Sequence, residues 1–441
     1  MFNTIEKCIV CNHTVEEVVS LGEQYVVDFP KERDDSLLKA PLTLMRCTKC
    51  SMIQLKHRVH PDRLYKKMWY RSGINQMMKD ELLKIVERAS LTVELKDNDK
   101  VLDIGCNDGT LLGWYPKGIT TFGIDPCKEL VEEGMQTTKI DIGIPDYFSE
   151  AAINSLTRGL GVKPPKFKII TAISCFYDVL DPVRFLKDCK ALLDNEGVLV
   201  IQMNYLLKML DDTAFDNVSH EHLGYYSVMA LKEAVTLAGL ELQGVEESPC
   251  NGGSIRVYIT KKEFTSWGGK DTANKLWLIT KLDRMLLEEM RAGLDTNIPY
   301  TKFIHNMRIK ILSIKNLIGN LDRTEKIYVY GASTRGTVLM QILCREGGAD
   351  NFIAVAERDK NKFGLHMVGT WLPIVPEETF RKNATYALAL PWHFKDGIIK
   401  REEEWIKKGG KFVFPLPKPE LIHQDENVMF QVTGKLLCEQ I

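Results

Sequence analysis

The stretch VLDIGCNDGTLLGWY, residues 101–115, decides the fold of this chain. A short β-type run at 100–104 leads into a turn with Gly105 and Gly109, and a helical pattern follows. Glycine lets a turn approach a ligand closely, and the helix that follows presents free backbone N–H groups. About 20 residues further on, TTFGIDP places Asp125 at the end of a second strand, where a carboxylate can accept both hydroxyls of a ribose. The pattern predicts a nucleotide-type strand–turn–helix, although a plain strand–turn–helix without a ligand remains the alternative.

The segments that follow extend this pattern into an α/β sheet. KFKIITAIS (166–174) and GVLVIQMN (197–204) are β-type runs in alternating α/β order, which predicts a Rossmann-like domain. From 270 to 321 apolar residues recur at three- and four-residue spacing, as expected of packing helices.

A second, smaller Rossmann-like unit is predicted after these helices. KIYVYGASTRGTVLMQIL (326–343) repeats the strand–glycine–helix theme, and a strand candidate at 352–356 ends in Glu357. TYALAL (385–390) and KFVFPL (411–416) would complete its sheet. The loop from Gly331 to Gly336 can be either a structural remnant or a phosphate cradle.

Composition sets limits on the class of protein. A chain of 441 residues is too long for one compact core, so we expect several domains. The formal net charge of -1 gives no cationic field for nucleic acid or for an anionic membrane. We find no apolar run long enough to span a bilayer and no secretory signal at the start of the sequence. We therefore expect a soluble, cytoplasmic protein.

The cysteines form two C-x-x-C pairs, Cys8/Cys11 and Cys47/Cys50. Two such pairs can place four thiolates tetrahedrally around one zinc ion and leave no open coordination position. We therefore expect a structural zinc site, remote from any chemistry, although four unrelated thiols are the alternative. The other seven cysteines, at positions 106, 127, 175, 189, 250, 344 and 438, resemble ordinary small core residues.

The stretch NVSHEHLGYYS (217–227) contains the triplet His220-Glu221-His222. Three interpretations compete for it: a metal site, a general base with helper residues, or a polar surface strand without a function.

The order of the motifs resembles one family over nearly the whole chain. The spacing Asp103-x-Gly105-x-Asn107-x-Gly109 is similar to the S-adenosylmethionine loop of class I methyltransferases and differs from G-x-G-x-x-G. Around it stand PLTLMRCTKCSMIQL (41–55), the His-Glu-His triplet, NGGSIRVY (251–258), YGASTRG (330–336) and PWHFKDGIIKREEEWIKKGGKFVFPLP (391–417). This order resembles the nucleotide-sugar C-methyltransferases, which methylate carbon 3 of 4-keto-deoxysugars.

The resemblance implies a domain order and two bound groups. The expected domains are a zinc-binding module (1–62), a class I methyltransferase domain (63–265), a helical linker (266–322) and a C-terminal Rossmann-like nucleotide-sugar-binding domain (323–441). The cofactors would be S-adenosylmethionine and a structural Zn²⁺. The donor would be held by Asp103, Gly105, Asn107, Gly109 and Asp125, with Asp146, Tyr147 and Phe148 at the adenine ring.

The resemblance also assigns the triplet. Formation of a carbon–carbon bond requires a carbon nucleophile, and a base can remove the proton beside a ketone if the enolate oxygen is stabilised. By match with the family His222 would be this base, Glu221 would orient groups or contact the sugar, and His220 would line the pocket. Members often carry a tyrosine three residues before the base, where this chain has Ser219, so the substrate can differ in its amino or hydroxyl pattern.

Two tyrosines could compensate for this departure. Tyr70, in WYRSGINQ, would lie near the methyl donor, and Tyr177, after the fourth strand, would lie near the reacting carbons. For each of them a half-buried packing role is the alternative.

Substrate contacts are expected in both α/β units. Asn251 and Gly253 permit a tight turn before a strand in which Arg256 could meet a carboxylate or phosphate, with an internal salt bridge as the alternative. Ser333 and Arg335 are expected at the nucleotide diphosphate. The donor would then sit on one unit and the sugar nucleotide on the other, with the sugar ring between them.

Three classes of function follow from the sequence. The first is a C-methyltransferase for a nucleotide-linked 4-ketosugar, and the second is an O- or N-methyltransferase with the same architecture. The third is a non-catalytic or redox protein that uses the C-terminal Rossmann-like unit for nicotinamide. The missing G-x-G-x-x-G spacing speaks against it, and Glu357 at the end of a second strand keeps it open. We expect a monomer or homodimer that binds a nucleotide-sugar substrate and no nucleic acid.

Overall fold

The computed structural model describes residues 2–65, 71–137, 139–159, 164–264, 271–321, 325–345 and 348–424. The chain divides into two compact units. The first unit comprises Met1–Val18, Leu44–Lys208 and Glu221–Asn297, and the second comprises Val19–Thr43, Met209–His220 and Ile298–Ile441. The boundary therefore falls inside the triplet, between His220 and Glu221.

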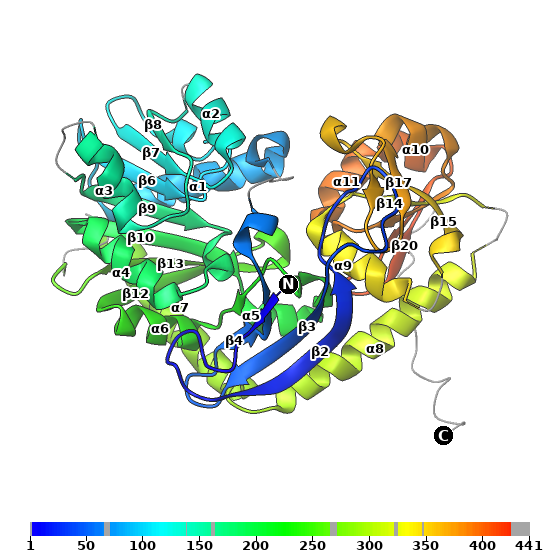
Figure 1. Cartoon of the computed structure of the whole chain (residues 1–441), viewed down its shortest axis with the longest axis horizontal. Coiled ribbons are helices and arrows are strands. Elements are labelled where there is room, and N and C mark those ends of the chain that lie inside the picture. The colour runs from blue at the N-terminus through cyan, green and yellow to red at the C-terminus, as the bar shows by residue number, and fades with distance from the viewer. Residues whose placement is uncertain are drawn as a thin grey trace. The chain divides into compact units, whose positions relative to one another are not determined.

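A seven-stranded sheet forms the centre of the first unit, in the order β12-β13-β10-β9-β6-β7-β8 (Figure 1). Its strands are β6 (Lys100–Ile104), β7 (Thr120–Ile124), β8 (Ile142–Ile144), β9 (Phe167–Ile173), β10 (Leu193–Asn204), β12 (Leu240–Ser248) and β13 (Ser254–Lys261). All neighbours pair in parallel except β13, which is antiparallel to both β10 and β12. The chain starts at β6, winds outward to β8 and returns to β9, so the carboxyl ends of β6 and β9 form a switch point, where ligands bind in such sheets.

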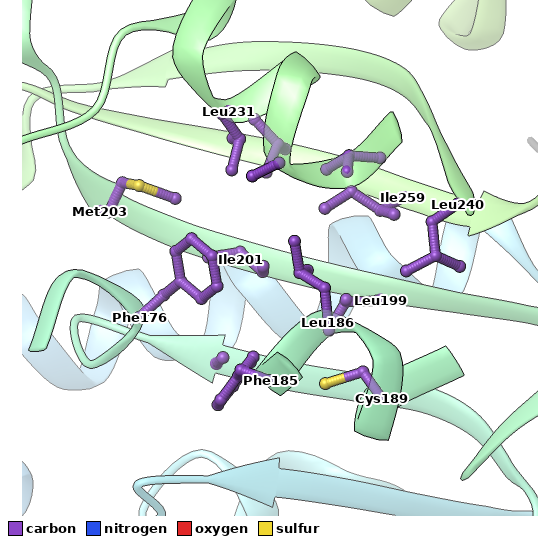
Figure 2. Packing of buried hydrophobic residues seen from close by; sticks show 14 of the residues in the cluster. Phe176, Phe185, Leu186, Cys189, Leu199, Ile201, Met203, Leu231, Leu240 and Ile259 are labelled. Atoms are coloured by element: carbon purple, nitrogen blue, oxygen red, sulfur yellow. The ribbon is translucent and has the colours of Figure 1, made fainter. Parts of the chain in front are cut away.

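Helices cover both faces of this sheet because its strands are apolar on both sides. The helices of the unit are α1 (Gln76–Thr92), α2 (Lys128–Gln136), α3 (Glu150–Gly159), α4 (Pro182–Leu192), α6 (Val228–Leu237) and α7 (Thr272–Ala292). On β10 the side chains of Leu199 and Ile201 pack with α4 and α6, as Figure 2 shows, whereas Val198 and Val200 join the cluster that contains α1. This period of two is the expected signature of a strand buried on both faces.

A smaller four-stranded sheet has the order β11-β4-β3-β2. Its strands are β2 (Val15–Tyr25), β3 (Lys39–Cys47), β4 (Ile53–Leu55) and β11 (Gly224–Tyr225), and a separate ribbon pairs β1 (Phe2–Thr4) with β5 (His57–Val59). The first C-x-x-C pair lies between β1 and β2, and the second spans the end of β3 and the turn before β4. The short β11 comes directly after the His-Glu-His triplet and pairs antiparallel with β4.

The second unit contains another seven-stranded sheet, in the order β16-β17-β15-β14-β18-β19-β20. Its strands are β14 (Ile327–Tyr330), β15 (Phe352–Glu357), β16 (His366–Met367), β17 (Leu372–Pro376), β18 (Tyr386–Ala389), β19 (Lys411–Phe414) and β20 (Glu420–Ile422). The five inner strands are parallel, and the two edge strands are antiparallel to their neighbours. The helices that belong to it are α8 (Ile298–Gly319), α9 (Thr334–Leu343), α10 (Glu377–Asn383), α11 (Lys395–Arg401) and α12 (Glu403–Lys407), and α5 (Leu206–Asp212) leads into the unit.

The predicted fold class is confirmed. The first sheet has the strand order and the single reversed strand of a class I methyltransferase, and the second is Rossmann-like. Helices α7 and α8 occupy the segment in which packing helices are predicted. No helix in the described part of the chain is long and apolar enough to cross a membrane. The ten described cysteines are free thiols, and Cys438 lies outside the described residues.

Candidate active site

The predicted donor loop follows β6 and has three left-handed residues. Gly105, Asn107 and Gly109 have φ values of 70°, 52° and 72°. A Cβ on Gly105 would lie 3.1 Å from the Sγ of Cys175, and one on Gly109 would lie 2.6 Å from Cγ1 of Ile140. Both positions therefore favour glycine, because a left-handed backbone angle and a close neighbouring side chain each disfavour a larger residue.

Asp125 is preorganised at the end of β7. Its Oδ2 accepts a hydrogen bond from the backbone N–H of Asn107 at 3.0 Å, and its Oδ1 accepts one from the N–H of Cys127 at 2.8 Å. Burial raises the pKa of Asp125, and the two backbone donors oppose this rise. Each carboxylate oxygen has a second lone pair, so the group can still accept hydrogen bonds from the hydroxyls of a ribose.

Asp103 lies beneath the donor loop as a buried carboxyl group. Its Oδ1 accepts a hydrogen bond from Oγ1 of Thr171 at 2.6 Å. Burial raises the pKa of Asp103 to about 7, and the charge of Asp125 adds to the rise. Asp103 therefore changes its protonation state near neutral pH.

The segment predicted at the adenine ring follows β8. Asp146 is exposed, and the hydroxyl of Tyr147 donates to Oδ1 of Asp62 at 3.0 Å. Phe148 instead packs against the hydrophobic core, with its ring centroid 4.9 Å from that of Phe185. Of the three residues predicted at the adenine ring, Asp146 and Tyr147 therefore lie outside the hydrophobic core cluster, and Phe148 packs against it.

The loop that carries Glu221 and His222 is fixed through its peptide groups. The hydroxyl of Tyr65 donates to the carbonyl oxygen of Glu221 at 2.7 Å. The N–H of Leu223 donates to the carbonyl oxygen of Tyr177 at 2.9 Å. The ring of Tyr177 meets the imidazole of His222 edge-on, with centroids 4.6 Å apart, and His222 is 9% exposed. Tyr70 lies outside the described residues.

One turn of 3₁₀ helix, η4 (Phe176–Asp178), connects this loop to the donor loop. Cys175, just before it, donates from its Sγ to the carbonyl oxygen of Ile104 at 3.2 Å and lies against Gly105. Tyr177 contacts His222, as described above. Asp178, the last residue of η4, is not among the site residues predicted from the sequence, although its position directly after Tyr177 at a strand end was a usable signal.

The zinc ligands predicted from the sequence come together. The Sγ atoms of Cys8, Cys11, Cys47 and Cys50 all lie within 4.8 Å of one another, and those of Cys8 and Cys50 are 3.6 Å apart. A zinc ion with four bonds of about 2.3 Å to sulfur requires S···S distances of about 3.8 Å, so the four thiolates fit this metal. Backbone N–H groups also point at the sulfurs, as that of Lys49 does at Cys47 over 3.4 Å.

The zinc module contacts the chain that directly follows the triplet. The N–H of Leu55 on β4 donates to the carbonyl oxygen of Leu223, and Gly224 pairs with Gln54. The buried side chain of Gln54 accepts from the N–H of Ile9 and donates to the carbonyl of Lys7, both at 2.9 Å. Gln54 therefore connects the first cysteine pair to the strand that holds the chain after His222.

His220 belongs to the second unit. It is 1% exposed, and its Nε2 lies 2.9 Å from the carbonyl oxygen of Ala40. The interpretation of the triplet as a polar surface strand is wrong, because both histidines are buried and the triplet lies in a loop. Within the described ranges the only cluster arranged to hold a metal is the cysteine cluster, so the geometry gives no support to a metal site at the triplet.

The predicted substrate turn forms between β12 and β13. Asn251 and Gly253 have φ values of 54° and 117°, and a Cβ on Gly253 would lie 2.3 Å from Cγ of Lys208. Arg256, on the strand that follows, is 4% exposed and forms ion pairs with Glu81 at 2.8 Å and Glu246 at 2.9 Å. This is the internal salt bridge that the sequence left open as the alternative for Arg256.

The loop after β14 in the second unit has a different arrangement. Ser333 caps α9, since its Oγ accepts from the N–H of Gly336 at 3.1 Å. Arg335 instead forms an ion pair at 2.9 Å with Asp216, which also accepts from the indole N–H of Trp392 at 2.9 Å. The guanidinium of Arg335 therefore already has an anionic partner.

Three models of known protein families match successive parts of the chain and together cover most of it. A "Putative zinc binding domain" matches residues 8–65, a "Methyltransferase domain" matches 74–245, and a "C-methyltransferase C-terminal domain" matches 249–417.

The chain is also similar to individual proteins. The C-methyltransferase NovU of Streptomyces niveus is 25% identical over 96% of this chain and 98% of its own length. A ubiquinone biosynthesis O-methyltransferase of Haemophilus ducreyi is 31% identical over 25% of this chain, which spans about half (54%) of that relative. The crystal structure of magnesium protoporphyrin IX methyltransferase from Synechocystis with bound SAH overlaps 42% of this chain and 83% of its own, at 12% identity and a TM-score of 0.32.

The sheet order, the donor loop and the matched methyltransferase domain define an S-adenosylmethionine-dependent methyltransferase with a zinc-binding domain. Its C-terminal part matches the C-methyltransferase C-terminal domain and NovU aligns over 96% of the chain, and this similarity supports S-adenosylmethionine-dependent C-methylation as its activity. These similarities favour a methyltransferase over the redox protein that was the third class predicted from the sequence.

Proposed function

We propose that the enzyme methylates carbon 3 of a nucleotide-linked 4-keto-deoxysugar through an enolate, and that His222 is the base that forms the enolate. The observation that carries this proposal is the η4 turn. It touches the donor loop through Cys175 and the imidazole of His222 through Tyr177, so a buried histidine lies one turn away from the loop that would hold the methyl donor.

The chemistry requires a base beside a carbon that lies next to a ketone. Bound S-adenosylmethionine supplies an electrophilic methyl group, and the substrate must supply an electron pair on carbon. A neutral imidazole can remove the proton on carbon 3, because the neighbouring ketone at carbon 4 delocalises the resulting charge. The low exposure of His222 keeps water away from the carbanion, which water would otherwise reprotonate.

The other residues of this loop orient the base. Tyr177 packs edge-on against the imidazole, and the peptide of Glu221 is held by Tyr65, so the histidine ring has little freedom to turn away. Preorganisation of this kind is a large part of catalytic rate enhancement. Tyr177 and Glu221 are therefore proposed to position His222 and the sugar, and His220 to line the pocket.

The ligand anchors follow from the same geometry. Asp125 is proposed to bind the ribose of the donor, with Asp146 and Tyr147 near its adenine. In the second unit Ser333, at the amino end of α9, is proposed near the nucleotide diphosphate, since a helix amino end favours anions. Arg256 and Arg335 are not included, because buried carboxylates already pair with both of them.

The proposal is tested with S-adenosylmethionine and the thymidine, uridine, guanosine and cytidine diphosphate 4-keto-deoxyhexoses. Mass spectrometry should detect the gain of one methylene unit in one of them, and NMR should locate the new methyl group on carbon 3. In deuterated water without the donor, the wild-type enzyme should exchange the proton on carbon 3.

The matched variants are His222→Ala and His305→Ala, the second of which removes an exposed histidine on α8. His222→Ala should lower methylation and exchange about a hundredfold or more, the usual effect of losing a general base. His305→Ala should leave both unchanged. Undiminished exchange in His222→Ala, or a product methylated on oxygen, refutes the proposal.

A further inference from the structure

Asp178 is a partly buried acidic residue on the segment that links the donor loop to the proposed base. It ends the η4 turn, whose neighbour Cys175 lies against Gly105 and whose Tyr177 contacts His222. Its Oδ1 is buried, and no group in the described part of the chain forms a hydrogen bond with it. A buried polar atom without a partner is costly, so in enzymes such an atom often marks a ligand contact.

The surroundings of Asp178 disfavour its charged form. Burial raises the pKa of Asp178 well above its usual range, and the charge of Glu221 raises it further. The titratable groups around it are Cys175 and Tyr177 on its own segment, Tyr65 after η1 (Pro61–Arg63), Glu221 and His222 before β11, and Tyr226 after β11. Burial also raises the pKa of Cys175 and of the three tyrosines, so these four groups are neutral alongside Asp178.

A neutral carboxylic acid is a hydrogen-bond donor, whereas a carboxylate only accepts. The proposed reaction requires such a donor, because negative charge develops on the ketone oxygen as the proton leaves carbon 3. A donor that is already in place when this charge develops, in a site without water, is among the strongest contributions that an enzyme can make.

We propose that Asp178, as a neutral carboxylic acid, donates a hydrogen bond to the enolate oxygen of the substrate. This inference rests on the proposed function. In the step that it assists, the C–H bond at carbon 3 breaks, the proton goes to His222, and the electron pair forms the enolate whose oxygen accepts from Asp178. When the carbon then takes the methyl group, the carbon–sulfur bond breaks, its electron pair stays on sulfur, and the ketone re-forms while Asp178 keeps its proton.

Three variants test the proposal. Asp178→Ala removes the donor, Asp178→Asn keeps an N–H donor of the same size, and Asp181→Asn makes the same chemical change at an exposed residue three positions away. Asn is also a good N-cap for α4, which Asp181 caps through the N–H of Arg184 at 2.9 Å. The readouts are kcat and the rate of deuterium exchange at carbon 3, with the thymidine diphosphate 4-keto-deoxyhexose as the first probe, and circular dichroism verifies the fold.

Asp178→Ala should lower both rates about a hundredfold or more, the usual effect of losing one oxyanion donor, whereas Asp178→Asn should stay within about tenfold of the wild type. Asp181→Asn should not change them. The proposal is overturned if Asp178→Ala keeps wild-type rates, or if Asp178→Asn is as slow as Asp178→Ala.

The pH profile gives a second, independent readout. Wild-type kcat should fall at alkaline pH, where Asp178 loses its proton. In Asp178→Asn this alkaline fall should disappear; an unchanged alkaline fall contradicts the proposal. If the wild-type enzyme shows no deuterium exchange at carbon 3, the proposed function is refuted. If the wild-type enzyme exchanges normally and Asp178→Ala exchanges at the same rate, only the role of Asp178 is refuted.

Discussion

Arg256 offers the sharpest test of the distinction between a substrate anchor and a structural residue. Its Nε donates to Gln202 at 2.9 Å, and its other two nitrogens pair with Glu246 and Glu81 at 2.9 and 2.8 Å. All three charged side chains are buried, and Glu81 retains only Ser248 as a described partner when the arginine is removed. Arg256→Met therefore leaves a buried carboxylate without its cation.

Removal of one partner from a buried ion pair costs about 3–5 kcal/mol, because the remaining charge is uncompensated. We expect Arg256→Met to lower the urea midpoint of the first unit by an amount that corresponds to this range. The double variant with Glu81→Gln should recover part of the loss, since the uncompensated charge is then gone. The control is Lys128→Met, which breaks an exposed ion pair with Glu132 on α2 and should cost at most about 1 kcal/mol.

The assay combines urea unfolding, followed by fluorescence and circular dichroism, with steady-state kinetics. If Arg256 is structural, the folded fraction of Arg256→Met keeps its KM for the nucleotide sugar. If instead the variant keeps the wild-type unfolding midpoint and its KM rises more than tenfold, Arg256 binds the substrate and the reasoning above is refuted.

Three further predictions concern the donor, the zinc and a buried acid. Asp125→Ala should weaken binding of S-adenosylmethionine by about 1–3 kcal/mol in calorimetry, because a charge-assisted acceptor is lost; unchanged affinity would place the donor elsewhere. Gln54→Leu should speed the loss of zinc to a colorimetric chelator and slow deuterium exchange at carbon 3, while donor affinity stays the same; equal rates of zinc loss would show that Gln54 does not stabilise the module. Asp103→Asn keeps the acceptor for Thr171 but removes a group whose pKa is about 7 in the folded protein. The same carboxyl ionises near pH 4 in the unfolded chain, so unfolding releases a proton between about pH 4 and 7. In urea titrations the free energy of unfolding of the wild type, relative to that of Asp103→Asn, should therefore fall as the pH rises through this window. If the difference in unfolding free energy between the wild type and Asp103→Asn does not change with pH, the raised pKa of Asp103 is contradicted.

The local parts of the fold were predictable from the sequence. The strand at 100–104 and the acid at the end of the second strand were found where the sequence predicts them, because strand period and glycine turns are properties of neighbouring residues. The four zinc ligands were predictable for the same reason, since each C-x-x-C pair is a local unit.

The partners of buried charges were not predictable. Arg256 meets Glu81 across 175 positions in the sequence, and Arg335 meets Asp216 across 119. Such pairings depend on which helix packs against which strand, and no local pattern encodes that. The burial of Asp178 escaped for the same reason, because its environment comes from three separate segments of the chain.

The loop around His222 shows how these separate segments act together. It has no regular secondary structure, so no helix or strand ladder fixes its backbone. Its peptide groups are held instead by the Tyr65 hydroxyl, by the carbonyl of Tyr177 and by the N–H of Leu55 on β4. The last of these contacts depends on the zinc module, because β4 directly follows the second cysteine pair and is tied to the first pair through Gln54.

A general base must be held within a fraction of an ångström of its productive position. A zinc ion bound by four thiolates has no open position for substrate, but it fixes the two cysteine pairs and hence β4, the strand that follows the second pair. The zinc module therefore supports the site through the backbone of the loop that carries His222. On this reasoning, removal of the metal should impair proton removal before it impairs donor binding, because the donor loop after β6 has no hydrogen bond to β4 among the contacts described above.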